Sequence, residues 1–226
     1  MTVESSARDQ RPVFEQLVKR MAREILEPAG FAAETSRRWT RSPSSDFTHI
    51  IEWQKGKWTR SSDVHFYVNL TSLWLSGPPN RAFGDSPQEW IPPVAISDRL
   101  TIDASDPDMP RVAEPWGKQS RVDQFVLRRD TDLDLLIQVL RRRFRDQVLP
   151  RLDSVATVSD CVEELREPDR SIPKAQTLLL HFAAAGDRAA AQEQYWRLRR
   201  HFADRGFPRE QYIRQLVEQL ALSEPQ

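Results

Sequence analysis

The chain has 226 residues, of which 39% are hydrophobic and 29% charged, a composition that supports a packed core and excludes disorder throughout. Lysine plus arginine and aspartate plus glutamate number 33 each, which excludes a global electrostatic attraction to nucleic acid or an anionic membrane. One cysteine, Cys161, excludes an internal disulfide. We expect a soluble cytoplasmic protein, because neither a signal peptide nor an apolar run of 18 residues is visible.

The first predicted element is an amphipathic helix from Pro12 to about Glu27, which follows a flexible N-terminus over residues 1–11. Its apolar residues recur at i, i+3, i+4 and i+7, so one face of the helix should be buried. Pro28 and Gly30 should end it. The residues of this apolar stripe are Phe14, Leu17, Val18, Met21, Ala22, Ile25 and Leu26.

Three strands are predicted next, over Trp39–Arg41, Phe47–Lys55 and Val64–Leu75, with polar turns between them. The third strand alternates apolar and polar residues, which is typical of a half-buried antiparallel strand. Its apolar side should receive the first helix. That side carries Val64, Phe66, Val68 and Leu70, and the polar side carries His65, Tyr67, Asn69 and Thr71.

The segment from Ser76 to Trp116 is rich in proline, and we expect a long loop there with one strand over Val94–Ile102. Another strand is expected over Arg121–Leu127. Thr131 and Asp134 resemble a capping box that starts a second amphipathic helix, and Pro150 should end that helix. Its apolar residues are Leu133, Leu136, Ile137, Leu140, Phe144 and Val148.

After residue 153 the pattern becomes wholly helical, with segments over Asp160–Arg166, Lys174–Ala185, Arg188–Ala203 and Gly206–Leu222. The sequence therefore predicts an α+β domain over residues 12–153 and a helical C-terminal extension over residues 154–226. In the α+β domain, helices should pack on one face of a twisted antiparallel sheet of four or five strands.

The order of these pieces resembles the bacterial family called domain of unknown function 4304, over about residues 12–153. The family has no assigned activity, so the resemblance implies a fold and supplies no catalytic residues. Two positions depart from the family pattern, namely Ala32-Ala33 and Gly56. The resemblance is carried in order by Leu26-Glu27-Pro28-Ala29-Gly30-Phe31, Trp39-Thr40-Arg41, Ile50 to Lys55, Phe66 to Leu70, Arg99-Leu100, Trp116, Asp132-Leu133-Asp134 and Leu149-Pro150-Arg151-Leu152.

The candidate site is the polar face of the predicted sheet. A carboxylate near an imidazole can perform acid–base chemistry, because each group shifts the pKa of the other. The competing interpretation is an ordinary solvated sheet face. The catalytic candidates are Glu52, His65 and Tyr67, and the ligand-binding candidates are Gln54, Lys55 and Asn69.

Other patterns are better explained by structure than by function. Five tryptophans could line an aromatic groove, although core positions are commoner for this residue. Two arginine clusters could bind phosphate, but the neutral net charge favours solvent-facing helix surfaces. We expect no metal and no cofactor, because the four histidines and Cys161 lack ligand spacing and no glycine-rich phosphate loop is present. The tryptophans are Trp53, Trp58, Trp74, Trp90 and Trp116, and the arginine clusters are Arg141–Arg145 and Arg197–Arg200.

These observations favour a non-enzymatic binding or protein-interaction module over an enzyme. The expected partner is a protein, bound through the C-terminal helices or the proline-rich loop, and neither nucleic acid nor membrane is expected. Two alternatives stay open. One is an enzyme whose acid–base site is formed by Glu52 and His65, and the other is an immunity-type or toxin-linked partner protein.

Overall fold

The computed structural model describes residues 9–57, 59–77, 80–81, 90–91, 94–103, 107, 121–166, 172–202 and 218. Most of the N-terminal segment 1–11, most of the proline-rich segment and all but one residue of the helix expected over Gly206–Leu222 lie outside the described residues.

Internal contacts divide the chain into two compact units. The first takes Met1–Pro43, His49–Ser72 and Ile96–Ser154, and the second takes Ser44–Thr48, Leu73–Ala95 and Val155–Gln226. The second unit thus includes two stretches from the first half of the sequence as well as its C-terminal part. The domain boundary expected after residue 153 stays a prediction.

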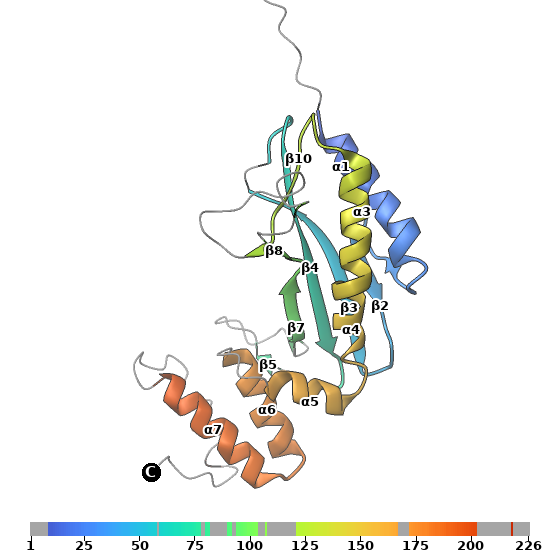
Figure 1. Ribbon diagram of the computed structural model, residues 1–226. Coiled ribbons are helices and arrows are strands. Elements are labelled where there is room, and N and C mark those ends of the chain that lie inside the picture. The colour runs from blue at the N-terminus through green and yellow to red at the C-terminus, as the bar shows by residue number, and fades with distance from the viewer. Residues whose placement is uncertain are drawn as a thin grey trace, which may run out of the picture. The chain divides into compact units, whose positions relative to one another are not determined.

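An antiparallel sheet packed against helices confirms the predicted α+β class (Figure 1). Its strand order is β1-β2-β3-β4-β10, and β7 also pairs with β4. The long strand β4 is therefore bordered by β3 on one edge, and by β7 and β10 on the other. The bounds are β1 (Ala32–Ala33), β2 (Arg38–Arg41), β3 (Phe47–Lys55), β4 (Val64–Trp74), β7 (Val94–Arg99) and β10 (Phe125–Leu127).

Two short ribbons accompany this sheet. In the first, β5 (Asn80–Arg81) pairs with β6 (Trp90–Ile91), and in the second, β8 (Ile102–Asp103) pairs with β9 (Arg121–Val122). The strand predicted over Val94–Ile102 is confirmed as β7 over Val94–Arg99, but its continuation to Ile102 is wrong, because Ile102 belongs to β8. The backbone N–H of Leu100 donates to the carbonyl of Val68, and the chain then leaves β4 and pairs with a different strand.

The first helix covers the apolar face of the sheet, as the periodicity predicts. It consists of α1 (Arg11–Met21) and a π-helical turn, η1 (Ala22–Leu26). Gly30 follows with φ of 83°, a left-handed conformation that a residue without a Cβ adopts without steric cost. Every residue of the predicted apolar stripe is buried.

The second sheet-covering helix runs through α3 (Leu133–Arg143), the π-helical turn η2 (Phe144–Val148) and α4 (Leu149–Asp153). The expected end at Pro150 is wrong. Proline lies in the first turn of α4, where its missing N–H is tolerated. The expected Thr131 cap is also wrong, because Asp132 accepts from the N–H of Leu135 while Thr131 accepts from Arg128.

Replacing Asp132 with alanine is expected to lower the free energy of unfolding by about 1 kcal/mol, because the carboxylate satisfies one of the open N–H groups at the helix start. Urea denaturation followed by circular dichroism measures this loss. Asp132→Asn keeps an oxygen acceptor and should stay close to the wild type. Equal losses in the two variants would show that the cap is not responsible.

Aromatic side chains join both helices to the buried sheet face. Phe14 of α1 lies 5.2 Å from Phe66 of β4 between ring centroids, and Phe144 stacks on Trp53 of β3 at 5.8 Å. Phe66 also lies 5.4 Å from Phe125 of β10. The main core therefore lies between the two helices and one sheet face, and the opposite face carries the polar residues of β4.

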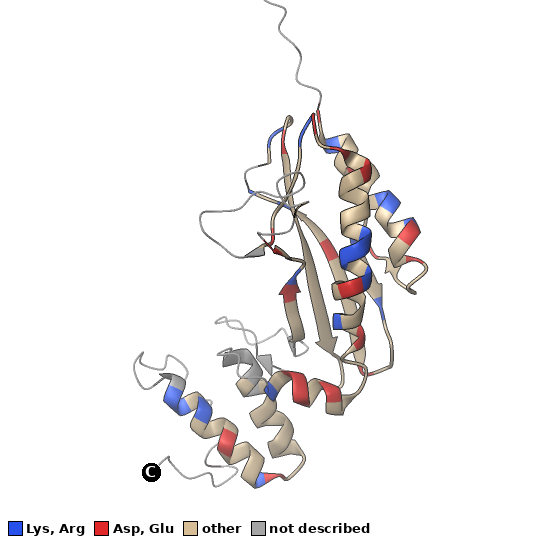
Figure 2. Ribbon diagram, in the orientation of Figure 1, with Lys and Arg blue, Asp and Glu red and all other residues tan. Residues whose placement is uncertain are grey.

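Two ion pairs join the first helix, through α1 and η1, to α3, and Figure 2 colours the charged residues along these helices. Arg20 pairs with Asp134 at 2.9 Å, and Glu24 pairs with Arg141. Part of the predicted basic cluster Arg141–Arg145 therefore lies against an acidic partner within the fold. The Arg20–Asp134 pair is exposed, and an exposed ion pair stabilises a fold by at most about 1 kcal/mol.

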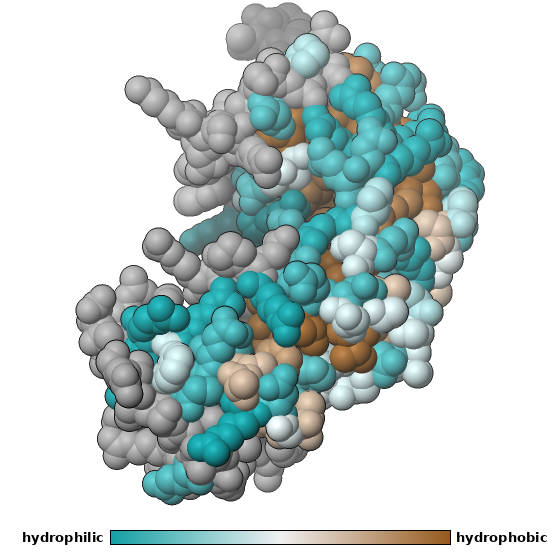
Figure 3. All heavy atoms as spheres, turned by 60° about the horizontal axis from the view of Figure 1, so that its bottom comes forward, coloured by the Kyte–Doolittle hydropathy of each residue, from teal (hydrophilic) through white to brown (hydrophobic). Residues whose placement is uncertain are grey.

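The second unit contains α5 (Val158–Arg166), α6 (Ile172–Ala184) and α7 (Arg188–Phe202). Gly186, with φ of 73°, and the capping carboxylate of Asp187 separate α6 from α7, as the sequence predicts. Trp74, at the end of β4, lies 5.0 Å from the ring of His181 in this unit. On the face shown in Figure 3, hydrophilic residues interrupt the apolar areas of the described surface.

Candidate functional site

The open face of the sheet carries the polar side chains that the sequence places there. Buried and half-buried residues alternate without a break along β4. Asn69 donates to the side-chain oxygen of Gln54 at 3.0 Å, which brings together these two predicted ligand-binding residues. The polar sheet face is thus confirmed as a structural feature.

The register of β3 against β4 separates the proposed acid–base pair. Gly56 N–H donates to His65 O at 2.7 Å, and the side chains of His49 and Ser72 meet at 3.1 Å. Both contacts place Glu52 opposite Asn69. His65 is four residues from Asn69, so Glu52 and His65 are separated by about 13 Å along the strand at about 3.3 Å per residue.

His65 and Tyr67 share one partner, Gln124. The nitrogen Nε2 of Gln124 lies 2.7 Å from Nδ1 of His65, and the Tyr67 hydroxyl donates to Oε1 of Gln124 at 2.7 Å. Burial, followed by the positive charge of Arg128, lowers the pKa of His65. The imidazole is therefore neutral at pH 7 and belongs to a short chain of hydrogen bonds.

Arg99 at the end of β7 occupies the middle of the open face. Its guanidinium lies 4.5 Å from the ring centroid of Tyr67, its Nε donates to Asn69 Oδ1 at 3.1 Å, and its Nη1 donates to Asp123 Oδ2 at 2.8 Å. Two residues of β4 and one residue of the connection between β9 and β10 hold this cation in one orientation. The sequence predicted no functional role for Arg99, and the only local signal was its position on a strand beside polar neighbours.

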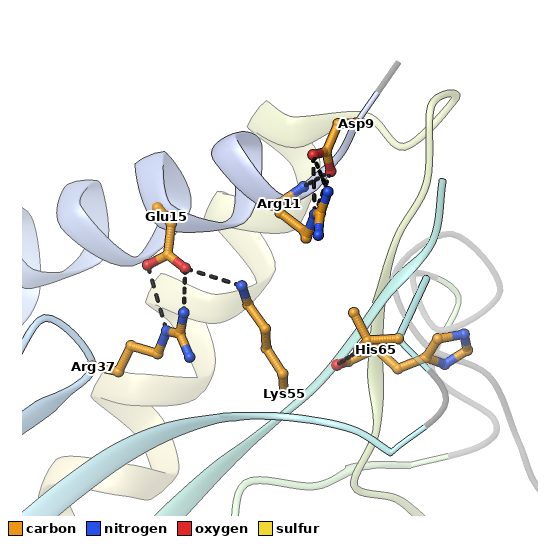
Figure 4. Close-up of polar contacts among 7 residues, drawn as sticks. Asp9, Arg11, Glu15, Arg37, Lys55 and His65 are labelled. Atoms are coloured by element: carbon orange, nitrogen blue, oxygen red, sulfur yellow. Dashed lines mark hydrogen bonds and ion pairs between the residues drawn. The ribbon is translucent and has the colours of Figure 1, made fainter. Parts of the chain in front are cut away.

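Lys55 lies on the other face of the sheet, apart from the remaining candidates. Its Nζ lies 3.1 Å from Glu15 Oε1, and Arg37 donates to the same oxygen at 2.6 Å (Figure 4). Burial acts to raise the pKa of Glu15, but the hydrogen bonds from Arg37 and Lys55 outweigh it and lower the pKa. This cluster joins α1 to the sheet, while the ring of His65 points away from it (Figure 4).

A hollow of about 720 Å³ opens on the polar face. It is lined at one side by β3 and β4 and at the other by the end of β7. Among the described residues, Glu52, Asp98, Asp123 and Arg99 supply its charges, and Asn69, Thr71, Ser97 and Thr101 supply neutral polar groups.

A second hollow, of about 470 Å³, adjoins the first. Both are lined by Leu70, Asp98, Arg99 and Thr101. The second also reaches the helix that covers the sheet, at the end of α3, the end of η2 and the middle of α4. Its additional charged residues are Asp103, Arg143 and Arg151.

Known proteins offer no guide to this face, since no family model, no curated protein and no solved structure matches the chain. The resemblance to domain of unknown function 4304 stays a prediction made from the order of its residues.

The remaining sequence candidates lie in the core or outside the described part. Trp53 and Trp74 are buried, and the side chains of Trp58, Trp90 and Trp116 are outside the described part, so the aromatic groove stays a prediction. Burial raises the pKa of the Cys161 thiol to about 12, which leaves it unreactive at neutral pH.

Among the described residues, no three histidine, cysteine, aspartate or glutamate side chains are grouped as a metal site would require. None of the described helices is both long and apolar enough to pass through a bilayer.

Proposed function

We propose that the protein is a binding module, without a reaction of its own, that captures an ammonium or guanidinium group of a small molecule in the larger hollow of its open sheet face. The observation that carries this proposal is the charge of the hollow. Three carboxylates, from Glu52, Asp98 and Asp123, face one cation, Arg99, which leaves a net charge of −2 among the described lining residues.

The carboxylates of this hollow differ in how far they are already engaged. Asp123 accepts from Arg99, and Asp98 accepts from the backbone N–H of Arg99. Within the described part of the chain, Glu52 is exposed and no hydrogen bond or ion pair to its side chain is formed. A concave surface of one sign concentrates its field, so Glu52 is the group best placed to meet an incoming cation.

The arrangement of the acid and base groups supports binding over catalysis. An acid–base site would need Glu52 and His65 within reach of one substrate atom. The register places them about 13 Å apart along the strands, and His65 is bound to Gln124 with a lowered pKa. A protein partner for the C-terminal helices and an immunity-type role stay predictions from the sequence.

Titration of the full chain with agmatine, which carries a guanidinium and an ammonium but no carboxylate, tests the proposal. We expect binding by isothermal titration calorimetry that weakens as salt is added, and a loss of about fivefold in affinity for Glu52→Gln, equivalent to about 1 kcal/mol for one screened charge pair. Glu27→Gln removes an exposed carboxylate outside the hollow and should bind as the wild type does.

Two results would contradict the proposal. The first is the absence of any heat or chemical-shift change with agmatine at low salt. The second is binding that Glu27→Gln weakens as much as Glu52→Gln, since the attraction would then be a property of the whole surface. A His65→Ala variant distinguishes this proposal from the alternative of an acid–base enzyme. If the hollow only captures a cation, agmatine should bind this variant as it binds the wild type.

A further inference from the structure

We infer that the smaller hollow takes an anionic group of the same ligand, so that the ligand is a small zwitterion such as a basic amino acid. This inference rests on the proposed capture of a cationic group in the larger hollow. It deepens that function by naming the ligand class.

The two hollows have opposite charge. In the smaller one, three arginines face two aspartates, a net charge of +1 among the described lining residues, whereas the larger one has −2. The arginines Arg99, Arg143 and Arg151 come from the end of β7, the end of α3 and α4. Three separate elements thus bring guanidinium groups to one concave surface. Arginine is the side chain best suited to bind a carboxylate, because its paired N–H groups match the two carboxylate oxygens.

Arg99 lines both hollows and is already oriented. Its Nε and Nη1 are used by Asn69 and Asp123. In the described part of the chain its Nη2 makes no further hydrogen bond, which leaves that edge of the guanidinium for a ligand. A group that is held before binding loses little conformational entropy when the ligand arrives.

Gln147 closes one side of the smaller hollow. In the amide orientation that gives hydrogen-bond partners to both its oxygen and its nitrogen, the oxygen accepts from Arg143 Nη1 at 2.7 Å and the nitrogen donates to Thr101 O at 3.3 Å. The helix and the β7–β8 connection are thereby joined, so the arginines on the helix and Arg99 on the strand keep a defined separation.

A ligand whose charges all have the same sign is attracted by only one hollow and is repelled by the other. A zwitterion that spans Arg99 gains from both, because its second charge binds at the high effective concentration set by the first. The expected order of affinity is therefore L-arginine, then agmatine, then glutarate, which carries two carboxylates and no cation.

Calorimetric titration of the full chain with these three compounds tests the inference. We expect L-arginine to bind at least about tenfold more tightly than agmatine, because agmatine has no carboxylate and so lacks one charge-assisted contact. Arg151→Gln should remove most of that difference and leave agmatine affinity unchanged. Arg145→Gln, on the exposed surface of η2 outside both hollows, should alter neither affinity.

Each failure has a distinct meaning. Equal affinity for L-arginine and agmatine, with both weakened by Glu52→Gln, would overturn the zwitterion while the capture of a cationic group stands. The absence of binding by both compounds would overturn both proposals. If Arg151→Gln unfolds, Arg143→Gln provides the same test, and equal loss of the two compounds in a folded variant also overturns the inference.

Discussion

Replacing Phe66 with alanine is expected to lower the free energy of unfolding by about 4 kcal/mol, the largest loss that we predict for a single substitution. Phe66 is fully buried, and its ring lies between Phe14 of α1, Trp53 of β3 and Phe125 of β10, at centroid distances of 5.2, 5.9 and 5.4 Å. Removing the ring leaves a cavity, because the three elements around it are held by their other contacts and cannot close in fully. Guanidinium denaturation measures the loss.

Thr71→Ala is the matched control, because it truncates a half-buried residue of the same strand on the open face. We expect a change below about 1 kcal/mol in its free energy of unfolding. Comparable losses in the two variants would mean that both faces of β4 are packed, which would contradict the single-core arrangement.

The stability of the protein should fall as the pH decreases from about 6.5 to about 4, and His49 should account for a large share of the fall. Its side chain is fully buried beside Ser72. Burial, then the charge of Arg41, lowers its pKa to about 4, and Asp153 opposes them. Because the unfolded histidine takes up a proton near pH 6.5, acid favours unfolding, by at most about 3 kcal/mol in free energy.

A His49→Gln variant isolates this contribution, because glutamine can still bond to Ser72 but takes up no proton in this range. Urea denaturation at several pH values should show the wild-type advantage over the variant shrinking by up to about 3 kcal/mol between pH 7 and pH 4. A difference that stays constant over this range would contradict the assigned role of His49.

Local pattern was sufficient to predict the first helix and the strands β3 and β4. The stripe from Phe14 to Leu26 and the alternation of β4 each reflect burial of one side of a regular backbone, and both are read within a dozen residues. The predicted end of β7 and the predicted helix cap were wrong, because contacts outside the local pattern decided them. Pairing with β9 separated Ile102 from β7, and Asp132 became the cap while Thr131 bound Arg128.

The candidate site was predicted only in part, for the same reason. The polar residues of β4 and Gln54 were found, since alternation assigns a side chain to a face. Alternation also separates Lys55 from Gln54, and the structure shows Lys55 at Glu15 on the covered face. Arg99 could not be found from the sequence alone, because Asn69 and Asp123 lie 30 and 24 residues away from it.

The sequence by itself determined the α+β class, the two buried helix stripes and the existence of a polar sheet face, because each follows from hydrophobic spacing along one segment. The tertiary structure alone decided the register that separates Glu52 from His65, and the meeting of Arg99 with Asp98, Arg143 and Arg151 around two hollows. Register and convergence depend on contacts between segments far apart in the chain, and no local pattern encodes those contacts.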